Sequence, residues 1–432
     1  MYEYTYSQAV DFFKNMPHFV PPKEGGAKKN YFSLDAELML LEKLDRPQDK
    51  LKYVHIAGTN GKGSTTSYLA SILKEASVVT GAFTSPFLYR YNEMFRVNGY
   101  DISDDDFAKV FSLVKPKYDE LVEDEIYVSE YEFLTVMAFV YFLEKGCEIV
   151  LLEVSMGGRM DTTNVIPSPL VTIITPISYD HMTILGNTLT EIATEKAGII
   201  KKGTSVISAS QEQEVVKVLE EACEKCHVSI EIVSPAKIID SSIEGQTFTV
   251  NEEKYFTTML GTYQIDNAAV AIAAAEKLAD KGYNITEEAI RNGIANTKWF
   301  GRFTLLSNNP PIIIDGGHNR QGAKVLRESL ETYFPGQKIT FVLGILQDKE
   351  VKIILDELMP IADKCYTVAV DSPRTMAPVD LANAISSYGV EAQVISDTKE
   401  IKEVLSKSKV GCIAGSLYLI KDAQVDTTNW KN

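Results

Sequence analysis

The chain has 432 residues, and 45% of them are hydrophobic, so it can bury a large core and we expect two or three domains. Its 59 acidic side chains outnumber its 43 basic ones, and the resulting net charge of -16, with no basic stripe, argues against nucleic acid as a partner. Five cysteines, an odd number scattered over a long chain, indicate reduced thiols.

The first ten residues, MYEYTYSQAV, lack the basic and apolar regions of a signal peptide. The longest apolar runs, such as Ile149 to Leu152, are far shorter than the about 20 residues of a membrane span. We therefore expect a soluble, cytoplasmic protein with no membrane contact. Cys223-Glu-Lys-Cys-His227 spells a c-type haem attachment motif, but it lies on a helix-like stretch and no export signal accompanies it, so we expect no haem.

Apolar strand-like runs alternate with helical stretches in the first part of the chain, which predicts a mostly parallel sheet of P-loop type with helices on both faces. These runs are Tyr53 to Ala57, Val78 to Phe83, Ile149 to Val154, Val171 to Thr175, Ser205 to Ala209 and Ile230 to Val233. Ser241 to Thr258 alternates β-branched and aromatic residues with polar ones and predicts a small antiparallel hairpin. An alanine-rich helix is predicted from about Asp266 to Asp280.

Thr297 to Gly301, TKWFG, is typical of a hinge, and the alternation starts again after it. The strands predicted there are Ile312 to Asp315, Ile339 to Leu343, Cys365 to Val370, Val394 to Ile395 and Val410 to Ala414. We predict an N-terminal ATP-binding domain over residues 1–296, a linker over 297–301 and a second, Rossmann-like α/β domain over 302–432.

The stretch that carries most chemistry is LKYVHIAGTNGKGSTTSYLA, Leu51 to Ala70. A buried strand leads into a turn with Gly58, Gly61 and Gly63, whose backbone N–H groups can point at an anion, and a helix follows. Lys62 and the Ser64–Thr65 hydroxyls add the groups that bind phosphate and metal. The spacing differs from the usual Walker A pattern, since Ile56 stands at the first glycine and Gly63 separates lysine from hydroxyl. We predict nucleotide binding.

The motif GTNGKGS, Gly58 to Ser64, resembles the loop of the folylpolyglutamate synthase and dihydrofolate synthase family, within the Mur ligase superfamily. Further motifs agree with that family in order, and the resemblance covers about Leu41 to Leu417. They are TSPFLYRYNE (Thr84 to Glu93), EVSMGGRMDTTN (Glu153 to Asn164), DHMTILGNT (Asp180 to Thr188), IATEKAGI (Ile192 to Ile199), YQIDNAA (Tyr263 to Ala269), and GRFTLL with IIIDGGHN (Gly301 to Asn319). LGILQDKE, Leu343 to Glu350, resembles the last loop of the family, without a role for Asp348 or Lys349.

The resemblance implies an enzyme that uses ATP and Mg²⁺ to convert the terminal carboxylate of a folate into an acyl phosphate, which the amine of L-glutamate then attacks. Dihydropteroate is the alternative acceptor, in a dihydrofolate synthase or a bifunctional enzyme. A cell-wall ligase of Mur type fits less well, because only about 50 residues precede the glycine-rich loop. A P-loop nucleotide switch that binds a partner is the remote alternative. We expect a monomer.

The resemblance also implies roles for single residues. Catalytic roles fall to Lys62, Lys196 and His181, and Mg²⁺ ligation to Ser85, Glu153 and His181. Glu153 also ends the apolar run IVLLE, where a carboxylate lies at the carboxyl edge of a sheet. Folate or pterin contacts fall to Glu132, Met160, Asp161 and Thr162. Nucleotide contacts fall to Gly58, Thr59, Asn60, Gly61, Lys62, Gly63, Ser64, Thr65, Asn267 in the first domain, Arg302, Asp315 and His318; for Asp315, a purely structural turn stays open.

Lys196 matches the lysine that the family and its Mur relatives carry as a carbamate, formed with carbon dioxide. The alternative is a surface lysine paired with Glu195 or Glu191. Three positions depart from the pattern of many bifunctional members near the pterin region, namely Phe87, Ser155 and Thr162. From these departures we predict that tetrahydrofolate or its one-carbon forms are better acceptors than dihydropteroate.

Overall fold

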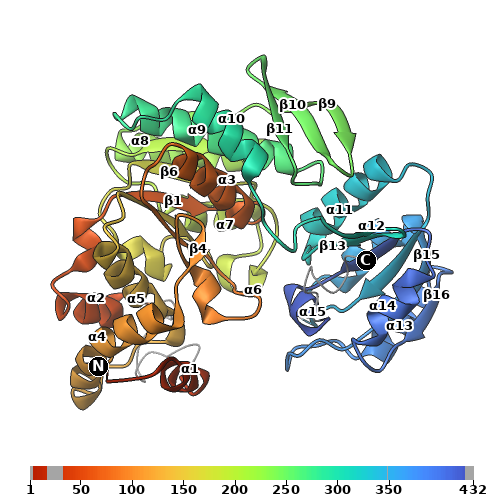
Figure 1. Cartoon of the computed structure of the whole chain (residues 1–432), viewed down its shortest axis with the longest axis horizontal. Helices are drawn as coiled ribbons and strands as arrows, with labels where there is room; N and C mark the ends of the chain where they lie inside the picture. Colours follow the sequence, from red (N-terminus) through yellow and green to blue (C-terminus); the bar gives the residue numbers. More distant parts are fainter. Residues whose placement is uncertain (1–2, 17–32, 348, 424–432) are drawn as a thin grey trace. The chain divides into compact units, whose positions relative to one another are not determined.

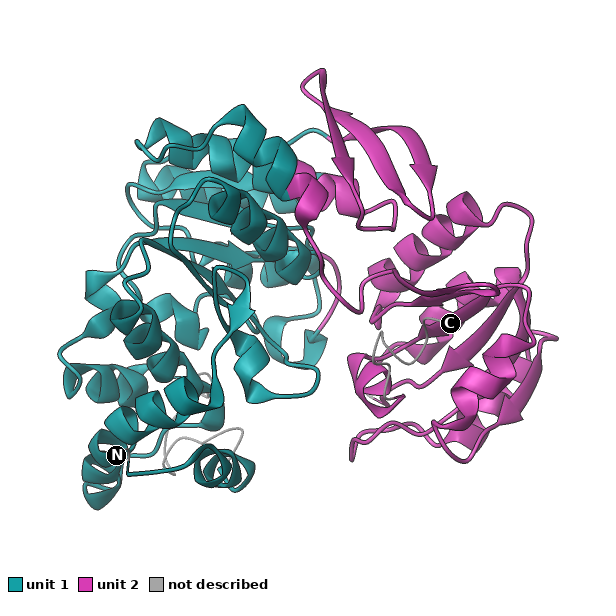
Figure 2. Cartoon of the chain, in the orientation of Figure 1, with its two compact units in different colours: residues 1–177, 181–234, 270–293 teal, residues 178–180, 235–269, 294–432 magenta. Residues whose placement is uncertain are grey.

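The structure is a computed structural model that describes residues 3–16, 33–347 and 349–423, which form two compact units (Figure 2). The first unit comprises Met1–Ile177, His181–Ser234 and Val270–Gly293, and the second comprises Ser178–Asp180, Pro235–Ala269 and Ile294–Asn432. Residues 235–269 thus group with the second unit, although the sequence placed them in the N-terminal domain. The boundaries 1–296, 297–301 and 302–432 stay a prediction.

The first unit is built on an eight-stranded sheet with the order β4-β3-β2-β5-β1-β6-β7-β8 (Figure 1). Its strands are β1 (Tyr53–Ala57), β2 (Thr80–Phe83), β3 (Phe95–Val97), β4 (Tyr100–Asp101), β5 (Ile149–Glu153), β6 (Val171–Ile174), β7 (Ser205–Ser208) and β8 (Ile230–Ile232). All neighbours from β2 to β8 in this order pair in parallel, whereas β3 and β4 pair antiparallel at the edge. The predicted mostly parallel sheet is confirmed. Strands β3 and β4 were not predicted, whereas the short strand β8 at the other edge was.

Every residue of β1 and β5 is buried, and because successive side chains of a strand point to opposite faces, both faces of the sheet are covered there. An aromatic core lies where α1, α4 and α5 pack together; the ring of Phe13, for example, lies 5.4 Å from that of Phe133, edge to face. The helices of this unit are α1 (Tyr6–Lys14), α2 (Asp35–Glu42), α3 (Lys62–Glu75), α4 (Asp104–Glu123), α5 (Glu130–Glu144), α6 (Met182–Leu185), α7 (Leu189–Ala197) and α8 (Gln213–Cys226), with short 3₁₀ helices η1 (Pro47–Lys50), η2 (Tyr91–Met94) and η3 (Thr162–Val165).

The second unit contains a small antiparallel sheet of three strands in the order β11-β10-β9. Its strands are β9 (Lys237–Ser242), β10 (Gly245–Val250) and β11 (Glu253–Thr257). The predicted antiparallel element is confirmed, and it gains a strand that begins before Ser241. The buried side chain of Gln246 donates hydrogen bonds to the carbonyls of Met259 and Gly261, at 2.8 and 3.0 Å, which ties the sheet to the loop before the next helix.

The predicted alanine-rich helix is α9 (Gln264–Asp280), which begins in the second unit and continues in the first, and α10 (Glu287–Asn296) follows it. The larger sheet of the second unit has the order β12-β13-β17-β14-β15-β16, in which only β12 is antiparallel to its neighbour. This confirms a second α/β domain. Its strands and helices are β12 (Thr304–Asn308), β13 (Pro311–Ile314), α11 (Arg320–Tyr333), β14 (Ile339–Leu343), α12 (Val351–Leu358), η4 (Met359–Ile361), β15 (Ala362–Thr367), α13 (Pro378–Ser386), β16 (Glu391–Val394), α14 (Glu400–Ser406), β17 (Gly411–Ala414) and α15 (Leu417–Asp422).

The five cysteines are free thiols. Cys223, from the haem-like motif, lies buried on α8, and burial raises the pKa of its thiol to about 11, as for an unreactive core thiol. Within the described ranges, no helix combines the length and the apolar character that crossing a membrane requires.

Candidate active site

The glycine-rich loop joins the end of β1 to the start of α3. Gly58 has a φ of +149°, and a Cβ atom at this position would lie 1.9 Å from the Thr175 hydroxyl, so only glycine fits. The N–H groups of Thr59 and Asn60 donate to the carbonyl of Pro176, at 2.9 and 3.2 Å, which anchors the loop to the segment after β6. Gly61, with a φ of +88°, precedes α3 and offers no side-chain cap. The helix therefore presents its first-turn N–H groups and positive dipole end to an anion.

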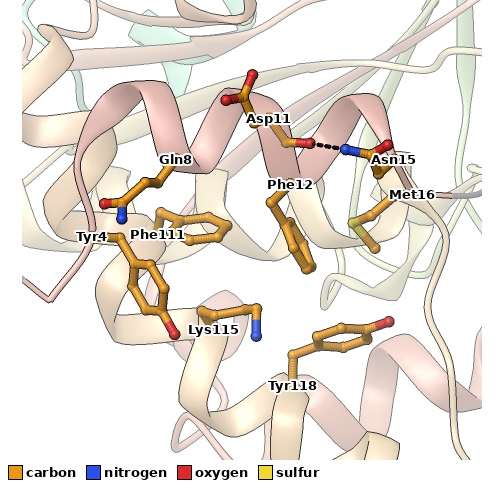
Figure 3. Close-up of a pocket in the computed structure, with 9 residues that line it drawn as sticks. All are labelled: Tyr4, Gln8, Asp11, Phe12, Asn15, Met16, Phe111, Lys115 and Tyr118. Atoms are coloured by element: carbon orange, nitrogen blue, oxygen red, sulfur yellow. Dashed lines mark hydrogen bonds between the residues drawn. The ribbon is translucent and has the colours of Figure 1, made fainter.

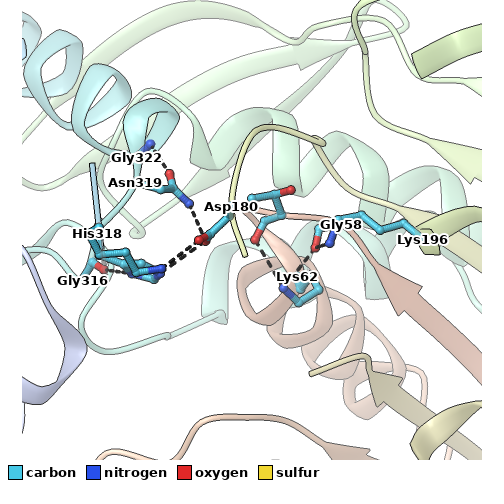
Figure 4. A network of polar contacts seen from close by, with 10 residues as sticks. Gly58, Lys62, Asp180, Lys196, Gly316, His318, Asn319 and Gly322 are labelled. Carbon is cyan, nitrogen blue, oxygen red and sulfur yellow. Dashed lines mark hydrogen bonds and ion pairs between the residues drawn. The ribbon is translucent and has the colours of Figure 1, made fainter. Parts of the chain in front are cut away.

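Two lysine side chains from different helices converge on this loop (Figure 4). Lys196 Nζ, on α7, donates to the Gly58 carbonyl at 2.8 Å, and Lys62 Nζ, on α3, lies 3.2 Å from the same oxygen and 3.3 Å from the Thr59 carbonyl. Lys196 is only 4% exposed. The alternative of a surface lysine is therefore wrong.

The loop after β5 holds α7 in place. The N–H of Arg159 donates to the Glu195 carbonyl at 2.8 Å, and its guanidinium pairs with the Glu195 carboxylate at 2.8 Å. A Cβ at Gly158 would lie 2.8 and 2.9 Å from the carbonyls of Glu195 and Lys196, so the glycine permits this close approach. Glu195 is thus paired with Arg159, and Glu191 closes the capping box of α7. Both acids thus make contacts other than the pairing with Lys196 that the surface alternative required.

The three predicted metal ligands lie at or after the carboxyl ends of β2, β5 and β6. In the sheet, β5 and β6 flank β1, and β2 is the next strand beyond β5. Ser85 follows β2, Glu153 ends β5, and His181 lies in the segment after β6. The Ser85 hydroxyl lies 3.4 Å from the Tyr131 hydroxyl. Burial is the largest cause of the raised pKa of Tyr131, and the charges of Asp161 and, more weakly, Glu153 raise it further. Ser85 and Glu153 thus share one environment. His181 is exposed and has a φ of +51° before α6.

The hydroxyl and carboxylate of this set are ligand types that Mg²⁺ prefers, and the imidazole is a third donor. Across the part of the chain that the structure describes, no group of three or more His, Cys, Asp or Glu side chains is arranged as a metal site. The predicted set contains only two such residues beside its serine. Of the two predicted hydroxyls on α3, Ser64 and Thr65 are both buried, and the Thr65 hydroxyl has no hydrogen-bond partner among the described residues.

Asp161 organises the loop that follows β5. Its carboxylate accepts four hydrogen bonds, from the N–H groups of Ser155, Met156 and Thr163, each at 3.0 Å, and from the Thr163 hydroxyl at 2.6 Å. The Thr163 oxygen also lies 2.8 Å from Nε2 of His55, a fully buried residue of β1. Because the hydroxyl gives its proton to Asp161, Nε2 must be the donor. Burial lowers the pKa of His55 to about 3, which keeps the ring neutral.

The other predicted folate contacts surround α5. Glu132 closes the capping box of α5, where its Oε2 accepts from the N–H and the hydroxyl of Ser129, at 2.6 and 2.7 Å. The Thr162 hydroxyl lies 2.7 Å from that of Thr135, so a buried partner on α5 accommodates the threonine at this position. Met160 is half-buried.

In the second unit, Asp315 follows β13 and is buried. Its carboxylate accepts from the Tyr263 hydroxyl and the Phe303 N–H, both at 2.8 Å, and from the Gly317 N–H at 2.6 Å. The guanidinium of Arg302 lies against Gly316, where a Cβ would be 2.4 Å from Nη1. These contacts support the structural role of Asp315, which shapes the turn after β13.

Asp180 is a half-buried anion whose partners the sequence did not predict. Within the second unit, Lys349 Nζ donates to its carboxylate at 2.8 Å. Asn319 Nδ2 donates to it at 3.1 Å, and His318 Nε2 lies 3.6 Å away (Figure 4). His318 also contacts the Gly316 carbonyl through Nδ1, at 2.9 Å. The family-like motif Leu343 to Glu350 contains Lys349 and was the only sequence feature that could have pointed to it. Asp348, in the same motif, lies outside the described residues.

Asn267 also groups with the second unit. Its side-chain amide donates to Gln264 Oε1 at 3.0 Å, and the residue is buried at the start of α9.

One surface pocket of about 540 Å³ lies in the first unit, away from these residues (Figure 3). It is formed where α1 meets α4, and its ammonium, Lys115, is already paired with Asp119. None of the predicted site residues lines it, so we assign it to the packing of these helices. The residues that line it are Tyr4, Gln8, Asp11, Phe12, Asn15, Met16, Phe111, Lys115 and Tyr118.

Comparison with known proteins gives the family. Residues 56–275 match the Mur ligase middle domain, and residues 301–417 match the glutamate ligase domain of Mur ligases. The dihydrofolate synthase/folylpolyglutamate synthase of Bacillus subtilis (strain 168) is 36% identical over 396 residues, which cover 89% of this chain and 92% of that protein. The chain belongs to the dihydrofolate synthase/folylpolyglutamate synthase family of Mur ligases. It is an ATP-dependent ligase that joins an acid to an amino acid.

Solved structures of this ligase family share the whole fold. The folylpolyglutamate synthase of Thermotoga maritima matches with a TM-score of 0.83 and 31% identity, over 98% of this chain and 96% of that one. The Mycobacterium tuberculosis folylpolyglutamate synthase, complexed with ADP and AMPPCP, matches with a TM-score of 0.86 and 28% identity, over 97% of each chain. The uncapped start of α3 in this chain suits the polyphosphate of such a nucleotide.

Proposed function

We propose that this ligase adds L-glutamate to the terminal glutamate carboxylate of tetrahydrofolate or its one-carbon forms. A carboxylate oxygen of the folate attacks the γ-phosphorus of ATP and ADP leaves. The amine of L-glutamate then attacks the acyl carbon, phosphate leaves, and the amine loses a proton. The observation that carries the proposal is the Gly58 loop with the Lys62 and Lys196 amines, in a chain whose relatives are glutamate ligases.

We assign the phosphates of ATP to the loop Gly58 to Thr65, with Lys62 as the charged contact. In the second unit, nucleotide contact by Asn267, Arg302, Asp315 and His318 stays a proposal. Arg302 supports it best, because its guanidinium can donate two parallel hydrogen bonds to a phosphate. Substitution of Arg302 by lysine removes the pair of parallel hydrogen bonds and keeps the charge. We expect this variant to have a higher KM for ATP and an unchanged KM for L-glutamate.

Ser85, Glu153 and His181 are proposed to hold Mg²⁺, which supplies charge neutralisation at the phosphates when bound. The shared environment of Ser85 and Glu153 supports the assignment. Mn²⁺ serves as a spectroscopic probe for the metal, read by electron paramagnetic resonance. We expect Glu153→Gln to weaken Mn²⁺ binding, whereas unchanged binding removes Glu153 from the set.

Lys196 is proposed to act as a carbamate. Its amine attacks the carbon of CO₂, a nitrogen–carbon bond forms, and a proton is lost, so that the side chain becomes an anion that hard cations prefer. The remaining N–H of the carbamate can still donate to the Gly58 carbonyl, where Nζ already lies at 2.8 Å. With carbon-13 bicarbonate we expect a carbamate signal that Lys196→Ala lacks and partial rescue of this variant by acetate. A signal that persists in the variant contradicts the assignment.

The choice of acceptor rests on Phe87, Ser155 and Thr162. Phe87 packs on Tyr91, with ring centroids 4.6 Å apart, and the Thr162 hydroxyl forms a hydrogen bond with that of Thr135 on α5. We propose a higher kcat/KM for tetrahydrofolate than for dihydropteroate. A dihydrofolate synthase activity is the second candidate, because the Bacillus subtilis relative is named for both activities. Product analysis by mass spectrometry with each acceptor decides the order.

We further propose a cytoplasmic monomer that has folate or dihydropteroate and L-glutamate as its small-molecule partners and binds neither nucleic acid nor membranes. The net charge of -16 supports the absence of nucleic acid binding. Light scattering at working concentration tests the monomer. A nucleotide switch is separated from a ligase by measuring ADP release with and without L-glutamate.

A further inference from the structure

Glu37 is a buried carboxyl group without a partner. It lies on α2 and is 0% exposed, and neither of its two carboxyl oxygens has a hydrogen-bond partner among the described residues. Buried carboxyl groups are normally paired or hydrogen-bonded, because burial removes the water that would otherwise solvate them. A carboxyl group left in this condition needs a reason.

Glu37 belongs to a group of three acidic side chains in the first unit. Helix α2 packs against α5, which carries Glu132. Burial raises the pKa of Glu37 well above its usual value, and the charges of Glu132 and Asp161 raise it further. Glu37 therefore lies close enough to interact with Glu132 and Asp161, which are two of the residues assigned to the pterin-bearing substrate.

Of these three acids, only Glu37 keeps both oxygens without a partner. Asp161 accepts four hydrogen bonds from its own loop, and Glu132 accepts two from Ser129. The three acids are not arranged as a metal site in the described part of the chain. Acidic residues at these three positions offer no positive charge to a phosphate or a carboxylate, which argues against ATP and the glutamate tail as ligands here. The occupant must be a donor of hydrogen bonds.

We propose that Glu37 is a specificity-determining residue that accepts hydrogen bonds from the pterin ring of the acceptor. This inference rests on the proposed function. The pterin carries an exocyclic amino group beside a ring N–H, and these two parallel donors match the two oxygens of one carboxylate. Because they hydrogen-bond the charged form, they would favour the ionised carboxylate in the complex, against the raised pKa of the unliganded group. Loss of one charged hydrogen bond, about 1.5–3 kcal/mol, corresponds to about a 10- to 150-fold change.

The test compares acceptors with and without the pterin. Glu37→Gln and Glu37→Met are assayed with tetrahydrofolate and with p-aminobenzoyl-glutamate, which lacks the pterin. We expect both variants to raise the KM for tetrahydrofolate by about 10- to 150-fold, with the KM for ATP and the rate with p-aminobenzoyl-glutamate unchanged. Glu42→Gln is the matched control, because Glu42 is an exposed carboxylate on the same helix, paired with Arg46. We expect no change from it.

The outcomes separate the two proposals. If the wild-type chain adds glutamate to neither tetrahydrofolate nor dihydropteroate, the proposed function fails. If it is active but the Glu37 variants lower the rates with both kinds of acceptor equally, Glu37 is structural and the inference fails. For variants that are too slow for kinetic assays, the Kd for tetrahydrofolate is measured by calorimetry. A folded Glu37→Met variant that binds tetrahydrofolate as tightly as wild type also overturns the inference.

Discussion

Replacing Thr163 by valine removes the hydroxyl at the centre of the buried chain His55–Thr163–Asp161 and changes the shape of the side chain little. Asp161 loses its shortest hydrogen bond, at 2.6 Å, and the His55 Nε2–H loses its acceptor at 2.8 Å. A buried polar group left without a partner costs about 1–3 kcal/mol. Asp161 keeps three other donors and His55 has no second partner for Nε2, so we expect a loss of about 2–4 kcal/mol for the first unit.

Amide hydrogen exchange in β1 measures this loss, because a central buried strand exchanges when its unit opens. Thr163→Ser is the matched control, since serine keeps both hydrogen bonds and lacks only a methyl group, worth about 1 kcal/mol. We also expect the valine variant, and not the serine variant, to raise the KM for the folate acceptor, because Asp161 holds the loop assigned to it. Equal protection of β1 in both variants would refute the hydrogen-bond chain.

Three further predictions concern the same unit. Burial holds the pKa of His55 near 3, against 6.5 in the unfolded chain, so the unfolded state binds the proton first as the pH drops. The free energy of unfolding therefore falls by about 1.4 kcal/mol per pH unit from pH 6.5 toward 3. His55→Gln removes this slope, and a difference in unfolding free energy between the two proteins that stays constant over this range contradicts the prediction. Gly58→Ala places a methyl group 1.9 Å from the Thr175 hydroxyl, so we expect a higher KM for ATP, whereas Gly203→Ala, also at positive φ but with open space around it, leaves this KM unchanged; equal effects count against the loop argument. Lys62→Ala is expected to lower kcat by about 100-fold in an ADP-release assay, and near-normal turnover of the folded variant would remove Lys62 from the mechanism.

Strands that are buried on both faces could be predicted from the sequence, because an unbroken apolar run is a local signal. Tyr53 to Ala57 and Ile339 to Leu343 were predicted at the bounds that the structure has. The glycine-rich loop was predictable for the same reason, since the positions of its glycines depend on local backbone geometry. Two-residue strands such as β4 carry no such signal.

The contacts that give single residues their environment depend on chain segments far apart in sequence. Asp180 and Lys349 are 169 residues apart, and nothing near Asp180 indicates its cation. The sequence analysis did not single out Glu37, because its burial follows from the packing of α2 on α5. Asp161 differs, because the four donors to its carboxylate lie in its own loop, and its contact with substrate stays a prediction.

The most direct test of the proposed function is to follow ADP release and product mass together, with the purified chain, ATP, Mg²⁺, tetrahydrofolate and L-glutamate. A glutamate ligase must couple the two, because ADP leaves only when the folate carboxylate is phosphorylated and glutamate then completes the turnover. We predict one ADP for each glutamate added and a product longer by one glutamyl residue. ADP release that is independent of folate and glutamate, with no lengthened product, would contradict the account.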